Sequence, residues 1–261
     1  MFSSSFHHHH LLPLLLLLLS VLLCLKSAIG AEHRIGTLTE FTNFVNSVNS
    51  YGAKYNGTTV YLDSDLTLSG ITGQIGKSIS NHFQGMFDGQ GHTISDLKIN
   101  TTSENTGLFG YSKGMTVRNV VLDESCSVTN SMTSTAFTWV EVGGIVGYCD
   151  ASTSSCTIEN NVNMASVTFS GNTSDKGYLF IGGIVGRLDS TDGKYTSVAR
   201  NCVNYGSVTR SGEIFYTYLG GIEGISQGSS KAHAYIQNCA NYGTITRSRI
   251  VSESLYIGGI S

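Results

Sequence analysis

Proline and charged residues are scarce in this chain of 261 residues. The single proline is Pro13, and Asp, Glu, Lys and Arg together make up 13% of the sequence, with a formal net charge of −3. This balance provides no basic surface for nucleic acid and no strong attraction to an anionic membrane. We therefore expect no nucleic-acid partner. Glycine is abundant, with 31 residues, which is typical of many short strands joined by turns.

Motifs for metal, cofactor or catalytic chemistry are also missing. The sequence has no His-Glu-x-x-His run, no cysteine pair at the short spacing of a zinc site, and no glycine-rich phosphate loop that opens a helix. No Ser/His/Asp triad can be assembled with any specificity. We therefore predict that the protein binds no metal or cofactor and is not an enzyme.

One long apolar run is present, and it lies within residues 1–30. Residues 11–25 are nearly all leucine, and the small residues that follow predict a signal peptide cleaved after Gly30 or Ala31. Because no basic residue precedes the run and Pro13 interrupts it, an uncleaved signal anchor is the alternative. We expect no membrane span after removal of the leader, and a location outside the cell or on its surface.

Two further features fit an extracellular chain. Glycosylation sequons begin at Asn56, Asn100 and Asn172. Five cysteines remain after the leader: Cys126, Cys149, Cys156, Cys202 and Cys239. The odd number leaves at least one thiol unpaired or in an intermolecular bond, and the sequence does not decide which cysteines pair.

A short glycine-rich phrase recurs along the second half of the chain. Gly-Gly-Ile begins at Gly143, Gly182, Gly220 and Gly258, in steps of 39, 38 and 38 residues, and a looser copy begins at Gly107. A period in this range is typical of stacked-repeat proteins, in which each unit buries its apolar face against its neighbours. The outer faces of such a stack are where its function is expected.

The segment before the repeats has a different pattern. Thr37 and Glu40 form a capping box, and apolar residues then recur at helical spacing as far as Val48. We predict an amphipathic helix over about 38–50, within an N-terminal cap of residues 31–56. Stacked-repeat proteins need such caps because an uncovered terminal strand recruits other chains.

From residue 57 onward, short runs of alternating apolar residues are separated by glycine-containing turns, which indicates strands. Each repeat contains three such runs. We predict an all-β fold, a right-handed parallel β-helix over residues 57–261, with about one three-strand coil per repeat of 37–39 residues. Two coils per repeat are the alternative, and would double the spacing of equivalent residues from about 4.8 Å to about 9.6 Å.

Residues 83–99, which contain Asp88-Gly89-Gln90-Gly91, are followed by Gly-Leu-Phe-Gly at Gly107 and then by the Gly-Gly-Ile-Val-Gly units. This order of motifs resembles the GLUG-repeat proteins, and the resemblance covers residues from about 35 to the end. It implies an extracellular β-helical repeat segment of the kind found in microbial surface proteins and in some secreted metallopeptidases. It implies no particular activity, because these repeats are accessory segments joined to different effectors.

Aromatic residues recur at two positions of the repeat, four and two residues before the first glycine. They are Trp139, Tyr178 and Tyr216 at the first position, and Phe180, Tyr218 and Tyr256 at the second. Both positions alternate with inward aliphatic residues, so we expect two adjacent aromatic columns on the outside. Such columns bind sugar rings or a partner protein, or else only brace neighbouring coils, at about 0.2–1 kcal/mol per pair.

These features lead to three functional hypotheses. The first is an adhesin-like binding or stalk module for glycans or extracellular proteins. The second is a structural spacer or an accessory segment of a larger secreted enzyme. The third is a β-helical carbohydrate-active enzyme, because Asp88, His92 and Asp96 lie near one turn and paired acids catalyse glycoside hydrolysis.

The sequence ends at Ser261, inside a repeat and with an aliphatic strand uncovered. We expect either that the protein continues or that another chain covers this coil. End-to-end association at the C-terminal coil is therefore one expected interaction.

Overall fold

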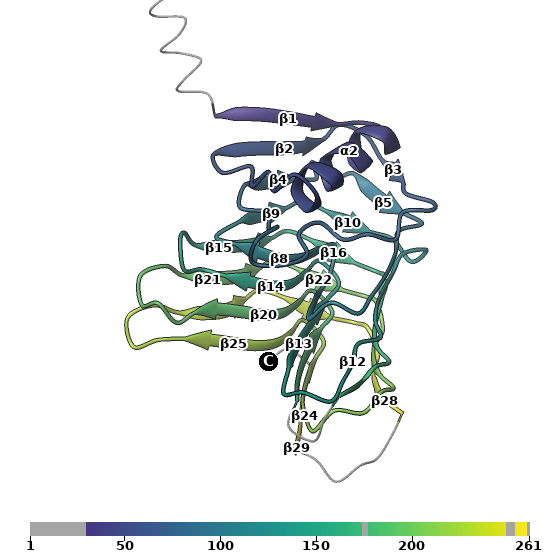
Figure 1. Ribbon diagram of the computed structural model, residues 1–261, viewed down its shortest axis with the longest axis vertical. Coiled ribbons are helices and arrows are strands. Elements are labelled where there is room, and N and C mark those ends of the chain that lie inside the picture. Colours follow the sequence, from purple (N-terminus) through teal and green to yellow (C-terminus); the bar gives the residue numbers. More distant parts are fainter. Residues whose placement is uncertain (1–29, 174–176, 249–253, 260–261) are drawn as a thin grey trace, which may run out of the picture.

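The computed structural model describes residues 30–173, 177–248 and 254–259, so the predicted signal peptide lies outside the described residues up to position 29. Parallel strands form a β-solenoid of about 4 turns, with only 5% helix. Figure 1 shows the strands stacked along the long axis of the molecule, with the helix near the N-terminal end. The prediction of an all-β, parallel β-helical fold is confirmed.

The described residues form six parallel sheets, named A to F here, which run along the solenoid. Sheet A contains β1 (Ala31–Ile35), β2 (Thr58–Leu62), β4 (Met86–Asp88), β9 (Thr116–Arg118), β15 (Cys156–Glu159), β21 (Ser197–Arg200) and β26 (Ala234–Gln237). Sheet B contains β3 (Leu66–Thr67), β5 (Thr93–Ser95), β10 (Val121–Leu122), β16 (Val162–Asn163), β22 (Val203–Asn204) and β27 (Ala240–Asn241). Sheet C contains β8 (Phe109–Lys113), β14 (Val146–Asp150), β20 (Val185–Ser190) and β25 (Glu223–Gly228).

The remaining sheets complete each coil. Sheet D contains β6 (Lys98–Thr101), β11 (Ser127–Asn130), β17 (Ser166–Phe169), β23 (Val208–Arg210) and β28 (Ile245–Arg247). Sheet E contains β7 (Asn105–Thr106), β13 (Trp139–Gly143), β19 (Tyr178–Gly182), β24 (Tyr216–Gly220) and β29 (Ser254–Gly258). Sheet F pairs β12 (Thr133–Ser134) with β18 (Asn172–Thr173). The chain passes through sheets A, B, D, E and C in turn before it returns to sheet A.

Each repeat forms one coil, as predicted. Tyr178 is in register with Trp139 on one side and with Tyr216 on the other, so residues one repeat apart are direct neighbours. The corner isoleucines also stack, because the Ile145 N–H donates to the Ile184 carbonyl at 3.0 Å and the Ile184 N–H to the Ile222 carbonyl at 2.9 Å. Residues at the same position of successive repeats therefore lie in continuous rows along the solenoid.

The prediction of three strands per coil is wrong, because each full coil has five main strands. Two of the predicted strands are divided by corners. The Gly-Gly-Ile phrase separates sheet E from sheet C, and an asparagine in the left-handed region, such as Asn160 with φ 56°, separates sheet A from sheet B. Asparagine adopts this conformation more readily than other non-glycine residues.

An asparagine ladder in the core explains the second glycine of each pair. The Nδ2 atom of Asn163 donates to Oδ1 of Asn204, and Asn204 donates in the same way to Asn241, each at 2.8 Å. A Cβ atom on Gly183 would lie 2.3 Å from Cγ of Asn204, so only glycine fits against the ladder at this corner. The ladder satisfies polar groups in the core and links successive coils.

The N-terminal cap has a helix, α2 (Leu38–Asn49), where the sequence predicts one over about 38–50. The Thr37 hydroxyl accepts a hydrogen bond from the Glu40 N–H, and the Glu40 carboxylate accepts hydrogen bonds from the Thr37 hydroxyl and from the N–H of the preceding Gly36, so Thr37 and Glu40 cap the helix reciprocally. Phe44 of the buried face lies 5.8 Å from Phe83, ring to ring. Unlike the prediction, the sheet begins before residue 57, because β1 precedes the helix and pairs with β2 along its whole length.

Candidate functional site

The outer faces of sheets C and E meet at an inward-bent corner. Figure 1 shows sheet C extending to the left, with sheet E below it and to its right. The two backbones approach closely, since a Cβ atom on Gly186 of β20 would lie 2.6 Å from the Val142 amide nitrogen of β13. Side chains that point outward from the two sheets therefore face one another. We call this region the corner.

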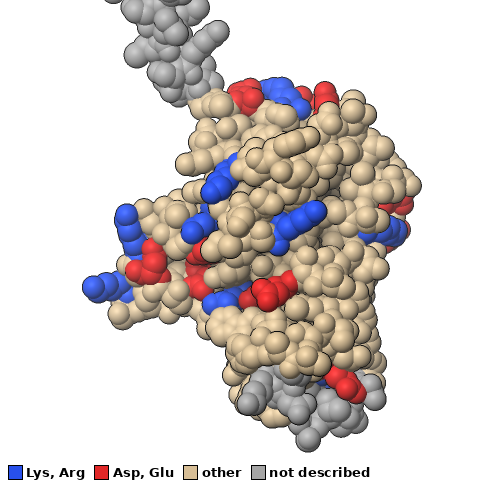
Figure 2. Space-filling model, in the orientation of Figure 1, with Lys and Arg blue, Asp and Glu red and all other residues tan. Residues whose placement is uncertain are grey.

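The half of the corner nearer the N-terminus, the polar half, is lined by charged and hydroxyl side chains. They are Asn105 and Glu141 from sheet E, and Tyr111, Tyr148, Asp150, Arg187 and Asp189 from sheet C. The opposite half, the aromatic half, is lined by the rings of sheet E: Tyr178, Phe180, Tyr216, Tyr218 and Tyr256. Figure 2 shows acidic and basic atoms side by side in the middle of this face, above an uncharged surface.

Arg187 holds the polar half together. Its guanidinium lies 3.4 Å from Glu141 and 2.8 Å from Asp189, and it also lies over the ring of Trp139, 4.5 Å from the centroid. The side chain is almost completely buried, so these contacts are shielded from water. Because Glu141 and Trp139 belong to sheet E and Arg187 to sheet C, this residue joins the two faces.

Burial changes the acid–base properties of this half. Loss of water raises the pKa of Glu141 to about 7, and the attraction of Arg187 only partly opposes this effect. Burial also raises the pKa of Tyr148 and of Tyr111 above their ordinary value. Both phenols remain protonated and donate to the carboxylate one coil further along, Tyr111 to Asp150 at 2.9 Å and Tyr148 to Asp189 at 3.1 Å.

The predicted aromatic columns exist as stacks in the aromatic half. Tyr178 and Tyr216 stack at 4.5 Å between centroids, with 15° between their planes. Tyr218 and Tyr256 stack at 4.7 Å and 12°. Trp139 begins the first column, is 36% exposed, and meets Tyr178 edge to face at 6.0 Å.

The prediction that Phe180 lies on the exposed outside is wrong, because the residue is only 2% exposed. Its ring lies 5.2 Å from Tyr218, 6.1 Å from Trp139 and 6.1 Å from Tyr178. The inward bend of the corner also brings β25 close to the backbone of this residue, since a Cβ atom on Gly224 would lie 2.7 Å from the Phe180 carbonyl carbon. Its partner in the column one coil earlier is not aromatic but the buried Glu141.

The stacked geometry limits what these rings can contact. In each two-ring stack one face of each tyrosine is covered by its neighbour, which leaves the edges, the hydroxyls and the end faces of the stack for a partner. Tyr256 is exposed and Tyr178, Tyr216 and Tyr218 are half-buried, so these rings offer rigid, amphipathic edges to a partner. At the C-terminal end of this half, Tyr218, Gly224 and Tyr256 line a hollow of about 300 Å³, together with Leu219, Ile257 and Gly258.

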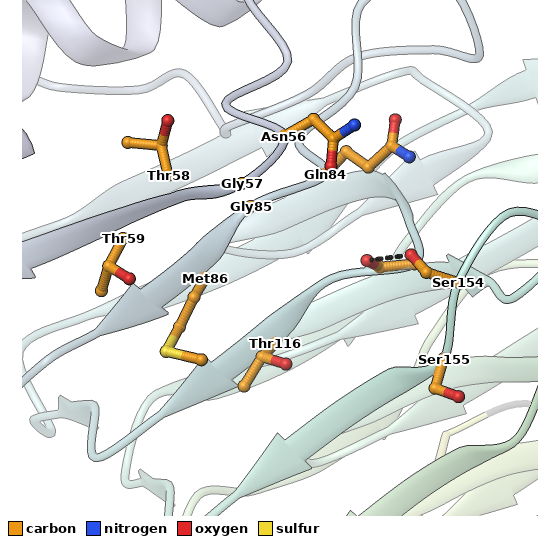
Figure 3. A pocket seen from close by; sticks show the side chains of 11 residues that line it. Asn56, Gly57, Thr58, Thr59, Gln84, Gly85, Met86, Thr116, Ser154 and Ser155 are labelled. Carbon is orange, nitrogen blue, oxygen red and sulfur yellow. Dashed lines mark hydrogen bonds between the residues drawn. The ribbon is translucent and has the colours of Figure 1, made fainter. Parts of the chain in front are cut away.

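The three predicted sequon asparagines, Asn56, Asn100 and Asn172, are all exposed. Asn56 also lines a shallow hollow of about 360 Å³ on the outer face of sheet A, drawn in Figure 3. The labelled side chains there are hydroxyls, amides and one thioether, and none of the residues that line the hollow is charged. This hollow therefore contains no group suited to acid–base catalysis.

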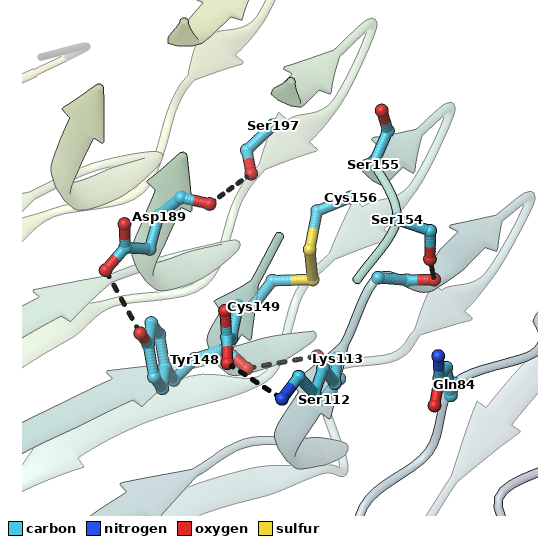
Figure 4. The surroundings of a disulfide bond; sticks show 12 residues. Gln84, Ser112, Lys113, Tyr148, Cys149, Ser154, Ser155, Cys156, Asp189 and Ser197 are labelled. Carbon is cyan, nitrogen blue, oxygen red and sulfur yellow. Dashed lines mark hydrogen bonds and ion pairs between the residues drawn. A yellow bond between two sulfur atoms is a disulfide. The ribbon is translucent and has the colours of Figure 1, made fainter. Parts of the chain in front are cut away.

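The cysteines divide into three kinds. Cys149 and Cys156 form a disulfide that joins β14 to β15 within one coil, and Figure 4 shows it near Tyr148 and Asp189 of the polar half. Cys126 is a buried free thiol, and burial raises its pKa to about 11. Cys202 and Cys239 are free thiols on adjacent coils. Sequence alone had left this pairing open.

The turn with Asp88 and His92, which suggested a carbohydrate-active enzyme, does not have the arrangement of a catalytic pair of acids. Asp88 is buried, and although burial opposes ionisation, hydrogen bonds from Asn119, the Gln90 N–H and Arg118 lower its pKa below the ordinary value. His92 instead contacts Asp65 at 3.1 Å. Asp88 is thus occupied by structural bonds. Among the described residues, no group of His, Cys, Asp and Glu side chains could hold a metal ion.

Sequence reasoning missed a further exposed stripe at the boundary between sheets B and D. Tyr205 and Tyr242 are 53% and 70% exposed and stack at 5.2 Å, and Met164 precedes them in the column. Tyr205 and Met164 line a hollow of about 540 Å³. The phrase Asn-Tyr-Gly at residues 204–206 and 241–243 was the signal that would have revealed it.

The comparisons with known proteins support the fold. No protein-family profile matches the chain. No curated protein matches it either. A solved structure from Bacteroides ovatus, named a "putative immunoglobulin A1 protease", is similar with a TM-score of 0.53 and 21% identity, over 82% of this chain and 67% of that one. At this identity the likeness shows a shared β-solenoid fold. The resemblance to the GLUG-repeat proteins stays a prediction.

In the part of the chain that the structure describes, no helix has the length and apolar character to cross a membrane.

Proposed function

We propose that this protein is an extracellular β-solenoid that binds a partner through the aromatic half of the corner. The observation that carries the proposal is the pair of stacked tyrosine columns on sheet E, which lie beside a charged region locked by internal bonds. Tyrosine supplies a large, rigid contact area with a polar tip, at low entropic cost. An uncharged surface of this kind is suited to docking.

Secretion is part of the proposal. The leucine-rich leader predicts export, and the three sequon asparagines are exposed. The Cys149–Cys156 bond adds independent support, because disulfides persist mainly in oxidising compartments.

The ring geometry favours a protein partner over a glycan. A sugar ring stacks on the face of an aromatic ring, but the stack of Tyr178 on Tyr216 already covers one face of each of these rings. Edges and hydroxyls instead suit the mixed polar and apolar surface of a protein or an extended peptide. Glycan binding would be restricted to the ends of the columns.

A second role, as an accessory segment or spacer of a larger secreted enzyme, is supported by the similar Bacteroides ovatus structure, whose name includes a protease. The resemblance to the GLUG-repeat proteins implies the same role. The two roles are compatible, since an accessory segment often delivers an enzyme to its target by binding it.

The test is a binding screen of the purified mature protein against an array of extracellular proteins and an array of glycans. We expect a hit on the protein array that Tyr178→Ala and Tyr218→Ala each weaken at least about tenfold, the loss typical of an anchoring aromatic residue. Tyr242→Ala, at an exposed stacked ring outside the corner, is the matched control and should bind normally. Hits only on the glycan array would replace the protein partner by a sugar, and no hit on either would leave the spacer role.

A further inference from the structure

Two free thiols lie side by side on consecutive coils, at the boundary between sheets A and B. The flanking strands are in register on both sides, with Arg200 opposite Gln237 and Val203 opposite Ala240. Cys202 is therefore opposite Cys239. Adjacent parallel strands lie about 4.8 Å apart, which is within the Cα separation of about 4.4–6.8 Å that a disulfide spans.

The sulfur atom of Cys239 points toward the coil that carries Cys202. The Cys202 N–H donates to the Sγ atom of Cys239 at 3.4 Å. Each thiol also lies near a carbonyl of its own strand, 3.3 Å from Arg200 for Cys202 and 3.4 Å from Gln237 for Cys239. The Cys239 side chain is thus held against the Cys202 backbone, while the Sγ atom of Cys202 also lies 3.5 Å from the Ile158 carbonyl of the preceding coil.

We propose that Cys202 and Cys239 form a second disulfide, between coils, by exchange with a low-molecular-weight disulfide. The bond would differ from Cys149–Cys156, which lies within one coil. It would tie the rung β21–β22 to the rung β26–β27 and close a loop of 37 residues. This inference does not depend on the proposed binding function.

The two thiols have different parts in the exchange. Cys239 is partly exposed whereas Cys202 is buried, and the hydrogen bond from Cys202 lowers the pKa of Cys239, so Cys239 is the attacking thiolate. It bonds to one sulfur of the small disulfide and releases the other as a thiolate, which takes up the Cys239 proton. Cys202, fully buried, then gives its proton to the second leaving thiolate and bonds to Cys239. Two protein thiols are oxidised, and one small disulfide is reduced to two thiols.

Cys126 provides the internal control. It is buried in the core near sheets B and D, with its Sγ atom 3.2 Å from the Ile94 carbonyl and no cysteine beside it among the described residues. It should remain a thiol under conditions that oxidise the pair.

The experiment treats the purified mature protein with oxidised glutathione, quenches with acid, alkylates in denaturant and maps the peptides by mass spectrometry. We expect a linked Cys202–Cys239 peptide, two hydrogens lighter than the reduced pair, with Cys126 alkylated. Cys126→Ser should give the same linked peptide, and Cys239→Ser should leave Cys202 alkylated. The thermal midpoint should rise on oxidation of the wild type and of Cys126→Ser, but not of Cys239→Ser.

Three results would overturn the proposal. These are alkylation of both Cys202 and Cys239 after oxidation, a glutathione adduct that persists on Cys239, and a dimer linked through Cys239. None of them bears on whether the tyrosine columns bind a partner, so the two proposals fail separately.

Discussion

The two halves of the corner have the same backbone arrangement but differ in how their side chains are packed and bonded. The position two residues before the first glycine is Glu141 in one coil and Phe180, Tyr218 and Tyr256 in the next three. The register of the coils is the same throughout. In the polar half the side chains are bonded to one another around the buried Arg187 and Glu141, whereas in the aromatic half the tyrosines stack and remain half-buried or exposed.

This comparison indicates that one part of a repeat surface can stabilise the fold while a neighbouring part remains available for binding. Buried charges stabilise only when paired, so the polar half tolerates little change. Stacked rings contribute less each and are less sensitive to replacement. A surface that must vary to suit a partner is therefore easier to build in the aromatic half.

The largest expected effect comes from breaking the polar half at Arg187. Arg187→Met should lower the free energy of unfolding by about 3–5 kcal/mol, because Glu141 and Asp189 would lose their buried cation. Arg200→Met is the matched control, since the Arg200–Glu159 pair is 45% exposed on the arginine side and should contribute less than about 1 kcal/mol. Guanidinium denaturation measures both, and equal losses would contradict the distinction.

The second effect is on pH dependence. The folded-state pKa of Glu141 is about 7, above its ordinary value near 4.5, so the folded protein binds this proton more tightly than the unfolded chain. Its contribution to stability is complete below pH 4.5 and is lost as the pH rises through about 7.

Glu141→Gln should therefore flatten the fall in unfolding free energy across this interval, by about 1–3 kcal/mol in total. Burial also raises the pKa of Glu223 to about 7, so Glu223→Gln tests the same interval outside the corner. Unfolding curves at several pH values between 4.5 and 8 provide the measurement. An unchanged slope in Glu141→Gln would show that this carboxyl is already ionised throughout the interval.

A smaller effect should follow from removing a single hydroxyl of the polar half. Tyr148→Phe loses the hydrogen bond to Asp189 and should cost about 1–2 kcal/mol, as expected for a bond to a charged acceptor. Tyr51→Phe, at a highly exposed ring, should have no measurable effect. If both variants unfold like the wild type, the tyrosine–aspartate hydrogen bonds of the polar half contribute nothing measurable to the free energy of unfolding.

The smallest effect should be found in the aromatic half. A double-mutant cycle on Tyr178 and Tyr216 should give a coupling of about 0.5–1.5 kcal/mol, since these rings stack at 4.5 Å. A coupling energy as large as that between Glu141 and Arg187 would show that the two halves of the corner do not differ in how strongly their side chains interact. A coupling energy of zero would show that the two rings do not stack in solution.

Periodicity in the sequence predicts the stripes because identical positions in successive coils are neighbours, as Tyr178 and Tyr216 are. It also locates the helix through Thr37 and Glu40, whose capping contacts are local. The corner was not predictable in this way. Its depth depends on how closely the backbones of sheets C and E approach at Gly186, which is a tertiary property.

The same limit explains the errors at single residues. Alternation correctly points Phe180 away from the core of sheet E, but alternation cannot show that sheet C bends over that face. The partner of Cys149 likewise depends on a turn that brings it within 6.2 Å of Cys156, Cα to Cα. The link from Glu141 to Arg187 joins residues 46 apart and follows no local pattern.

The most direct test of the central claim, that the outer faces of sheets C and E meet, is a double-mutant cycle between Glu141 and Arg187. Unfolding free energies of the wild type, Glu141→Gln, Arg187→Met and the double variant would be measured at pH 8, where Glu141 is ionised. Contact between the two sheets predicts a coupling of about 1–3 kcal/mol. Additive losses, within about 0.5 kcal/mol, would mean that the two side chains do not meet and that the corner does not exist.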